Sequence, residues 1–476
     1  MGPALASKTT ASVRQNLVLG ICMSLLLVGM DVTIVNVALP SIQRDLHASL
    51  SGLQWILDAY TLVVASLLML SGSMSDRFGR RRVFQIGLSL FLVGSLLCSL
   101  AHNIDQLVTY RALQGLGASM LNPVALSIIA NVFTEPKARG RAVGVWGAVG
   151  GLAFAVGPLL GGALTQAVGW RSIFWINLPI GIAAVVLAAI YVPESKAARA
   201  RTFDPVGQGL IFLGLTTLTY AVIEGPRAGW GSPSIRGLFA VAVAALAGFL
   251  LYESRHKEPL VDLRFFRSVP FSSSTILGVC AFSSFAAFLF LNALYLQQVC
   301  GFSAFHTGLS TLPLAVAMMV GSPWSGRLVG RYGTRPSLYA AGTGFLLSTL
   351  LMTQLTPGTP LALLLVTYAL FGLGLGMVNP AITNSAVAGM PLAQAGVAAA
   401  IASTGRQVGA ALGVAIAGTV VNASRTRGSS FTLATHPIWW IMAGCGAMVL
   451  LLGWVSATPW ARKSAEVAAA ELIAVG

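Results

Sequence analysis

The chain is dominated by apolar runs of about 20 residues, the length that crosses the hydrocarbon core of a bilayer as a helix. Inside a bilayer no water can bond the backbone, so every spanning run must satisfy its own peptide groups as a helix. Of the 476 residues, 56% are hydrophobic and only 9% are charged, which is too few charges for a soluble protein of this length. The runs therefore predict an all-α polytopic membrane protein.

Fourteen spans are predicted along the chain. They cover residues 15–39, 52–72, 83–101, 106–130, 141–165, 173–193, 205–224, 236–252, 271–297, 305–325, 336–354, 361–382, 395–421 and 437–457. The first run is too long for a cleavable signal core, so we expect it to stay as an anchor.

The basic residues give an independent test of this topology. With both termini in the cytoplasm, 21 of the 29 Lys and Arg residues fall in inner segments, six in outer segments and two, Arg111 and Arg406, within spans. Cytoplasmic loops carry such an excess of positive charge, which predicts both termini on the inner side. The same distribution argues against nucleic-acid binding, since no basic run is interleaved with aromatic residues.

Two segments of the first half recur in the second. ALQGLGASMLNP at 112–123 matches ALFGLGLGMVNP at 369–380, and a glycine- and arginine-rich segment at 72–80 matches residues 326–335. The offsets, 257 and 254 residues, agree closely enough to indicate a duplication with two extra spans between the copies. Paired halves of this kind build carriers whose site lies between them. The predicted domains are a cytoplasmic N-terminus (1–14), a six-helix bundle (15–193), two linking helices with their loops (194–270), a second six-helix bundle (271–457) and a cytoplasmic tail (458–476).

Six groups of residues carry a family resemblance. They are the loop at 72–82, Arg111 with Gln114, Gly115 and Gly117, the helix with Gly147, Gly151, Gly157, Pro158, Gly161 and Gly162, the run DVTIVNVALP at 31–40, Trp170 with Arg171, and NLPIG at 177–181. Together they resemble the major facilitator superfamily, and within it the fourteen-span drug:proton antiporters that include quaternary ammonium and methylenomycin resistance exporters.

The resemblance implies a bacterial plasma-membrane antiporter that exports drugs, antibiotics or dyes by alternating access as protons enter. A proton-linked uptake carrier or a lipid transporter of the same fold is the alternative, against which the antiporter-type glycines and proline of the fifth span argue. The expected partners are the bilayer, protons and a small-molecule substrate, and we expect a monomer.

Two acids lie deep within predicted spans, where a charge costs about 3 kcal/mol on insertion scales. Asp31, Asp58 and the span arginine Arg111 all fall in the outer half of their helices, by the rise of 1.5 Å per residue. We expect Asp31 to be the principal proton site, Arg111 to bias its protonation, and Asp58 to shape affinity for cationic substrates. A permanent structural Asp–Arg pair is the alternative, and a one-turn shift of the helix would leave Asp31 solvated.

Two further segments are expected to serve the conformational change. Gly72, Asp76, Arg77, Gly79 and Arg80 are expected to form a loop with a tight turn, whose charged groups pair with neighbouring helix ends as a latch. A pure topology signal is the alternative.

The fifth span contains Gly157, Pro158 and Gly161. Proline removes one intrahelical hydrogen bond and glycine permits close approach, so these residues predict a hinge facing the other half, or simply close packing.

The substrate cavity is expected to be lined by aromatic and polar side chains on the spans that flank it. The candidates are Trp55, Tyr60, Gln114, Asn122, Phe154, Phe285, Phe288 and Arg406. For any single aromatic, packing or lipid contact is the alternative. No acid occurs in spans nine to fourteen to pair with Arg406. Members of the resembled family that handle dications have carboxylates in the second half, so this departure weakens the case for divalent cations. Glu224 and Glu253, near the ends of the linking spans, are expected to be solvated at the interface.

The sequence lacks the motifs that are typical of several kinds of chemistry. The sequence has no Gly-Lys dipeptide for a P-loop and no His-Glu pair for an HExxH metal site. Five scattered cysteines have no CxxC spacing and are expected to pack between helices. We therefore expect no cofactor, no metal and no enzymatic activity.

Overall fold

The structure is a computed structural model that describes residues 3–197, 204–256, 259–390 and 394–473. Within these ranges every regular element is a helix. The helices are α1 (Pro3–Asp45), α2 (Leu50–Phe78), α3 (Arg80–Ser99), α4 (Ile104–Val132), α5 (Pro136–Ala167), α6 (Ser172–Trp175), α7 (Asn177–Tyr191), α8 (Pro205–Ala228), α9 (Pro233–Glu253), the 3-10 helix η1 (Leu263–Arg267), α10 (Val269–Leu294), the π-helical turn η2 (Tyr295–Val299), α11 (Ala304–Ser310), α12 (Leu312–Tyr332), α13 (Thr334–Met352), α14 (Leu361–Val387), α15 (Ala395–Arg425), α16 (Phe431–Val455) and α17 (Pro459–Ile473).

Within the described ranges, thirteen helical segments are long and apolar enough to cross a membrane. They include three composite segments, Ser172–Tyr191, Val269–Val299 and Ala304–Tyr332, each formed by two consecutive helices. The all-α polytopic prediction is thus confirmed. The predicted span 336–354 coincides with α13, which has 19 residues but is not among the thirteen. The count of fourteen stays a prediction.

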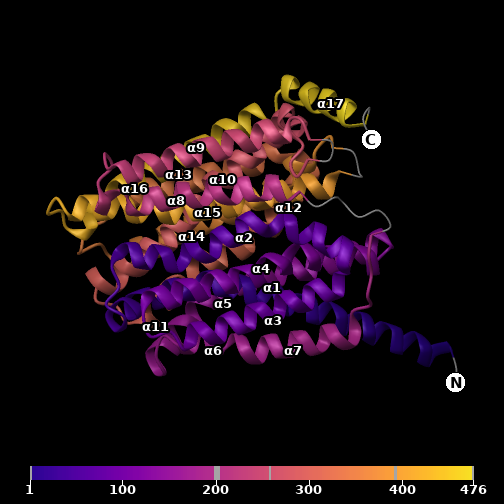
Figure 1. Ribbon diagram of the computed structural model, residues 1–476, viewed down its shortest axis with the longest axis horizontal. Helices are drawn as coiled ribbons and strands as arrows, with labels where there is room; N and C mark the ends of the chain where they lie inside the picture. The colour runs from indigo at the N-terminus through magenta and orange to yellow at the C-terminus, as the bar shows by residue number, and fades with distance from the viewer. Residues whose placement is uncertain (1–2, 198–203, 257–258, 391–393, 474–476) are drawn as a thin grey trace.

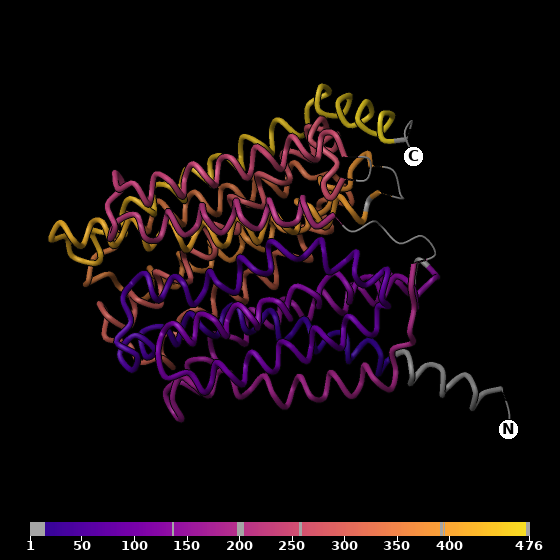
Figure 2. The backbone as a smooth tube through the Cα atoms, viewed as in Figure 1, coloured from indigo at the N-terminus to yellow at the C-terminus, as the bar shows by residue number. Residues whose placement is uncertain are grey.

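The helices form two layers that repeat the same internal pairing. In the first, α1 packs against α5, while α4 packs against α2 and α3. In the second, α10 packs against α15, while α14 packs against α12 and α13. Figure 1 shows α1 to α7 together on one side and α10 and α12 to α16 on the other, with the short α11 reaching across to α5, and Figure 2 shows the same separation along the backbone. The duplication seen in the sequence therefore corresponds to two similarly packed bundles.

Glycines at repeat-related positions explain why α4 and α14 approach their neighbours so closely. A Cβ added at Gly115 on α4 would lie 2.6 Å from the carbonyl oxygen of Tyr60 on α2. The repeat-related Gly372 on α14 is blocked in the same way by the carbonyl oxygen of Leu314 on α12. Small residues let helix backbones come into contact in a bilayer, where packing drives helix association.

This packing predicts opposite effects for two alanine substitutions. Gly117→Ala would place a Cβ 2.6 Å from the Gly87 carbonyl oxygen, against backbone that cannot move aside, whereas no atom lies within 4 Å of the same position at Gly330. We expect Gly117→Ala to destabilise the protein by about 1–3 kcal/mol. The control Gly330→Ala should be neutral or stabilising, because alanine favours the helix by about 1 kcal/mol. Thermal unfolding in detergent measures both, and equal melting temperatures would contradict the packing argument.

The helix pair α8 and α9 lies beside both bundles. α8 packs against α2 of the first bundle and α15 of the second, and α9 packs against α8 (Figure 1). The side chain of Gln208 on α8 donates to the Ser66 carbonyl on α2. Thr419 on α15 donates to the Val222 carbonyl on α8 at 2.7 Å. Of the linking helices, α8 therefore contacts both halves.

The helix α17 lies at the end of the bundles opposite α11 (Figure 1). The expected tail contains α17, held by an ion pair of 2.6 Å between Arg267 and Glu471 and by a hydrogen bond of 3.0 Å from the Val269 N–H to Ser464. Of the expected cytoplasmic segments, residues 1–2, 198–203, 257–258 and 474–476 lie outside the described ranges.

Candidate functional site

A buried ion pair joins the first and fourth helices. The Nη1 of Arg111 on α4 lies 2.6 Å from Oδ2 of Asp31 on α1. Asp31 is 0% exposed and Arg111 is 1% exposed, so neither charge reaches solvent in this conformation. The possibility that Asp31 is solvated at the surface is therefore wrong. Their approach follows from the near-equal depth that the sequence indicates for the two residues.

Neutral side chains complete the surroundings of Asp31. Gln114, one turn along α4 from Arg111, donates from Nε2 to Oδ1 of Asp31 at 2.9 Å and accepts from Nη1 of Arg111 at 2.7 Å. Asn177 on α7 lies 3.5 Å from the same Oδ1 and donates to Ser95 on α3 at 3.0 Å. Side chains of two other helices, α4 and α7, thus converge on one carboxylate, and α3 holds Asn177 from behind.

Arg111 is held from the other side by α2. Its Nε donates to the Ile56 carbonyl at 3.1 Å, and its guanidinium lies 4.3 Å from the centre of the Tyr60 ring. The backbone and ring contacts do not depend on the charge of Asp31. Removing the Asp31 charge would therefore leave Arg111 in place, still bonded to the Ile56 carbonyl and to Gln114. The network couples the charge on one carboxyl group to the packing of α1, α2 and α4.

Asp58 lies apart from this network. It is 0% exposed, and neither of its carboxyl oxygens has a hydrogen-bond partner. The neighbouring turns of α2 face α15: Gln54 donates to the Ala415 carbonyl at 2.8 Å, and Leu62 packs with Ala411. Asp58 therefore belongs to the stretch of α2 that closes against the second bundle. The structure does not join it to Arg111.

The two bundles meet closely at one end of α5. A Cβ added at Gly162 would contact the Ala304 carbonyl of α11, and one added at Gly308 of α11 would contact the Pro158 carbonyl. At Gly140 and Gly147, nearer the start of α5, no atom lies within 4 Å of the corresponding position. The bundles are thus in tight contact near Pro158, whereas α5 has open space beside Gly140 and Gly147.

The expected hinge residues lie at this contact. A Cβ at Gly157 would collide with the Thr33 hydroxyl of α1, and one at Gly161 would lie 2.9 Å from the Ile34 carbonyl oxygen. The two glycines therefore face α1, while the Pro158 carbonyl faces α11. Their role as a hinge stays a prediction.

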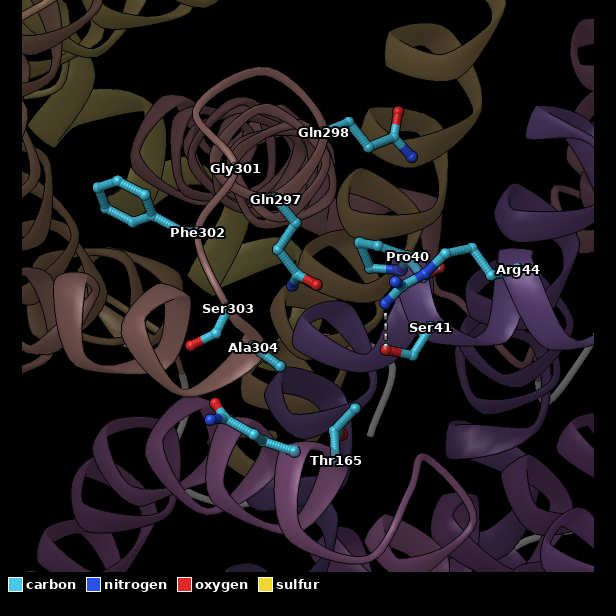
Figure 3. A pocket seen from close by; sticks show the side chains of 11 residues that line it. Pro40, Ser41, Arg44, Thr165, Gln297, Gln298, Gly301, Phe302, Ser303 and Ala304 are labelled. Carbon is cyan, nitrogen blue, oxygen red and sulfur yellow. Dashed lines mark hydrogen bonds between the residues drawn. The ribbon is translucent and has the colours of Figure 1, made fainter.

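A cavity of about 730 Å³ opens beside this contact (Figure 3). It is lined by Pro40, Ser41, Arg44, Thr165, Gln166, Gln297, Gln298, Gly301, Phe302, Ser303 and Ala304. Two of the lining glutamines, both on the π-helical η2, bond to α1 of the other bundle: Gln297 donates to the Val37 carbonyl at 2.8 Å, and Gln298 donates to Gln43 at 2.7 Å. The end of the molecule that carries α11 is therefore held shut by direct hydrogen bonds.

The predicted cavity residues are scattered. Phe154 of α5 and Phe285 of α10 meet across the bundles, with ring centres 5.8 Å apart. Trp55 donates to Glu224 of α8 at 3.2 Å, and so lies on the linker side of α2. Glu224, expected to be solvated, instead accepts this bond. Phe288 is fully buried within the second bundle.

Three polar candidates have different surroundings. Gln114 belongs to the Asp31 network, as described above. The Oδ1 of Asn122 is buried without a hydrogen-bond partner. Nη1 of Arg406 is also buried and unpartnered, and the guanidinium lies 5.9 Å from the Phe282 ring centre. Arg406 thus keeps a cation between the helices of the second bundle.

The turn within the predicted latch segment is shorter than predicted. α2 continues to Phe78 and α3 begins at Arg80, so Gly79, with φ of 114°, alone makes the turn. Gly72 lies within α2, and its expected place in the turn is wrong. Asp76 pairs with Arg80 one turn away at 3.0 Å, and Arg77 stacks 5.9 Å from the Phe78 ring. The charged groups of this segment therefore pair locally.

Sequence reasoning missed Glu194, which follows α7. Its carboxylate accepts from the backbone N–H groups of Arg81 and Arg82, both at 3.2 Å, and so caps the first turn of α3. It lies more than a hundred residues from its partners, and no local pattern identifies it. The Asn177 contact was also missed, although this residue is part of the NLPIG motif.

Known proteins share the sequence motifs and the helical fold described above. The pattern of the Major Facilitator Superfamily matches residues 21–414. A tetracenomycin C resistance and export protein of Streptomyces glaucescens is 38% identical, over 86% of this chain and 76% of the relative. A methylenomycin A resistance protein of Bacillus subtilis is 32% identical, over 92% of this chain and 96% of the relative.

A solved structure shows the same fold. The crystal structure of a D-xylose-proton symporter superimposes with a TM-score of 0.67, covering 92% of this chain and 97% of the symporter at 18% identity. The resemblance predicted from the motifs is confirmed by the family match and by the relatives. The chain is a multi-pass membrane protein and belongs to the Major Facilitator Superfamily.

Proposed function

We propose that this chain is a carrier of the bacterial plasma membrane that exports small amphipathic compounds, such as drugs, antibiotics or dyes, in exchange for protons. The names of the relatives support export of such compounds. The observation that carries the proton-coupled mechanism is the fully buried Asp31–Arg111 pair. A proton-coupled carrier needs a group within the bilayer that can gain and lose a proton, and buried carboxyl groups often mark such proton pathways.

In this mechanism Asp31 alternates between two states. As an anion it accepts from Arg111 and Gln114, and the three side chains hold α1 against α4. When a proton binds, the carboxyl group loses its attraction for Arg111, and the contact between these helices weakens. A proton thus biases an equilibrium between two packings, and the substrate biases the same equilibrium in the opposite direction.

Alternating access follows if the bundles formed by residues 15–193 and 271–457 rock about the site, with residues 194–270 linking them. In the described conformation the end with α11 is closed by the Gln297 and Gln298 hydrogen bonds. Because the N-terminal part of α5 is unobstructed at Gly140 and Gly147, we assign this conformation as open to the cytoplasm. In the opposite state the Asp76 segment would contact the second bundle as a latch, with Gly157 and Pro158 as the hinge.

The aromatic side chains between the bundles and the buried Arg406 favour a substrate without two positive charges. Phe154 and Phe285 offer aromatic surface from both bundles, and Arg406 contributes a buried cation without an acid partner. Neutral, anionic or singly charged amphipathic compounds fit these groups, and Asp58 provides a carboxyl group for a monocation once α2 and α15 separate. Repulsion from Arg406 disfavours dications.

Everted membrane vesicles from an efflux-deficient bacterial host test this function. The vesicles are acidified inside by respiration, and a panel of amphipathic dyes and antibiotics is then added outside. An antiporter moves the compound inwards and protons outwards, so at least one compound should collapse the proton gradient only when the chain is expressed. No response to any compound, with normal amounts of protein in the membrane, would contradict antiport. Substrate accumulation that adds protons to the lumen would indicate an uptake carrier instead.

A further inference from the structure

Two buried acids meet where the linking helices begin and end. Asp204 precedes α8 and Glu253 is the last residue of α9, and they are 5% and 3% exposed. One oxygen of each is bonded to backbone: Oδ1 of Asp204 accepts from the Gly207 N–H at 2.8 Å, and Oε2 of Glu253 accepts from the Val261 N–H at 3.1 Å. The expectation that Glu253 is solvated at the interface is therefore wrong.

The remaining oxygens of the two carboxyl groups face each other. Oδ2 of Asp204 and Oε1 of Glu253 are buried and have no hydrogen-bond donor. A Cβ added at Gly207 would contact both of them, so the two oxygens flank a single point beside this glycine. The two oxygens are thus close neighbours in a buried site. Two carboxyl oxygens can bond to each other only if one of them carries a proton.

The neighbouring groups of the described chain do not neutralise two negative charges. Tyr252 lies beside Asp204 and its ring stacks 5.0 Å from that of His256. The guanidinium of Arg264, in the next segment, is 2.6 Å from Asp262 and is already paired. On the α2 side the neighbour is Gln208, a neutral amide bonded to the Ser66 carbonyl. Two carboxylates sharing such a site cannot both ionise readily.

We propose that Asp204 and Glu253 share one proton and form a second proton-binding site of this protein, separate from Asp31. The proton joins the start of α8 to the end of α9 by a carboxyl–carboxylate hydrogen bond. When it leaves at high pH, two anions face each other in a buried site, and the ends of the helix pair separate.

The position of α8 connects this site to both bundles. The turn after Asp204 is tied to α2 through Gln208, and the other end of α8 is tied to α2 by Trp55 with Glu224 and to α15 by Thr419 with the Val222 carbonyl. Separation at the Asp204 end therefore alters a helix that contacts both halves. The site makes the linker sensitive to the pH on its side of the membrane. This inference does not depend on the proposed drug export.

The sign of the pH effect follows from proton counting. In the unfolded chain both carboxyl groups titrate near their usual values and are ionised above about pH 6. The folded protein then holds one proton more than the unfolded chain, so its stability falls as pH rises. The proton is fully retained at mildly acidic pH and its contribution is lost when the folded protein releases it.

Glu253→Gln in the purified full-length protein tests the proposal. The amide keeps an acceptor for the Val261 N–H and supplies a permanent donor to Asp204, so it mimics the singly protonated pair. Between about pH 6 and about pH 9, the melting temperature in detergent should fall more for the wild type than for Glu253→Gln, by at least about 2 °C. The matched control is Glu135→Gln, an exposed acid without a side-chain cap bond, which should retain the wild-type slope.

Infrared spectroscopy supplies a second measurement. The wild type and Glu135→Gln should show the absorption of a neutral carboxyl group that disappears at high pH, and both Glu253→Gln and Asp204→Asn should lack this component. Equal pH slopes in the wild type and Glu253→Gln, or an unstable Glu253→Gln at every pH, would overturn the proposal. The second result would mean that a cation of the chain compensates two carboxylates.

Discussion

Asp31→Asn is expected to abolish proton-driven export while leaving the protein folded. Asparagine is nearly the same size and its one amide oxygen can still accept from Arg111, although its Nδ2 cannot accept the second bond, from Gln114. It cannot release a proton, so the alternation on which coupling depends is lost. We expect at least a tenfold loss of the dye-induced proton movement in everted vesicles, about 1.4 kcal/mol or more in coupling, and a matching loss of drug tolerance in cells.

The control for this substitution is Asp105→Asn. Asp105 is also an aspartate near a membrane helix, in the first turn of α4, but its side chain is exposed. It should retain wild-type export. If Asp31→Asn retained full proton-driven export, Asp31 would be a structural residue and the mechanism would have to use another acid.

Arg111→Met is expected to be among the most destabilising single changes in the first bundle. It leaves Asp31 as a buried carboxylate without its cation, and breaking a buried pair by removing one partner costs about 3–5 kcal/mol. It also removes the bond to the Ile56 carbonyl and the contact with the Tyr60 ring. A large fall in melting temperature, with little protein reaching the membrane, is the expected result.

The double substitution Asp31→Asn with Arg111→Met separates the structural role of the pair from its transport role. Removing both charges eliminates the uncompensated carboxylate, so the melting temperature should recover much of the loss caused by Arg111→Met alone. Export should not recover, because the proton site is still missing. Recovery of both stability and proton-driven export would show that the pair serves only to hold α1 against α4.

Much of the fold could be predicted because its determinants are local in sequence. Each span can be recognised from its apolar run. The repeat can be recognised from matching glycines such as Gly115 and Gly372. The turn between α2 and α3 was placed correctly at Gly79, whose positive φ requires a residue without a Cβ. Gly72 was misplaced because a glycine within an apolar helix has the same local sequence signal as one in a loop.

The Asp31–Arg111 pair could be predicted because depth in a bilayer follows from counting residues along each helix. Depth does not give the direction in which a side chain points around the helix axis. Asp58 lies at a similar depth, yet its oxygens have no partner, because its face of α2 packs against the second bundle. Rotation about a helix axis is set by tertiary packing, which no residue count supplies.

The burial of Glu253 is a second feature that could not be predicted from the sequence. Its position at the end of a span suggests solvation, but its partner Asp204 lies at the start of the preceding helix and comes near only when α8 and α9 form an antiparallel pair. Glu194 likewise caps a helix that begins more than a hundred residues earlier. These contacts depend on connections between elements, whereas the spans depend on composition alone.

The most direct test of the central claim is proton release on substrate binding. Purified protein in weakly buffered detergent at mildly acidic pH is mixed with a dye that gave a response in the vesicles, and the change in bulk pH is recorded. Wild-type protein is predicted to release a proton as the substrate binds, and Asp31→Asn to release none while still binding the dye. Equal release from the wild type and Asp31→Asn would contradict the claim that protonation of Asp31, beside Arg111, drives this carrier.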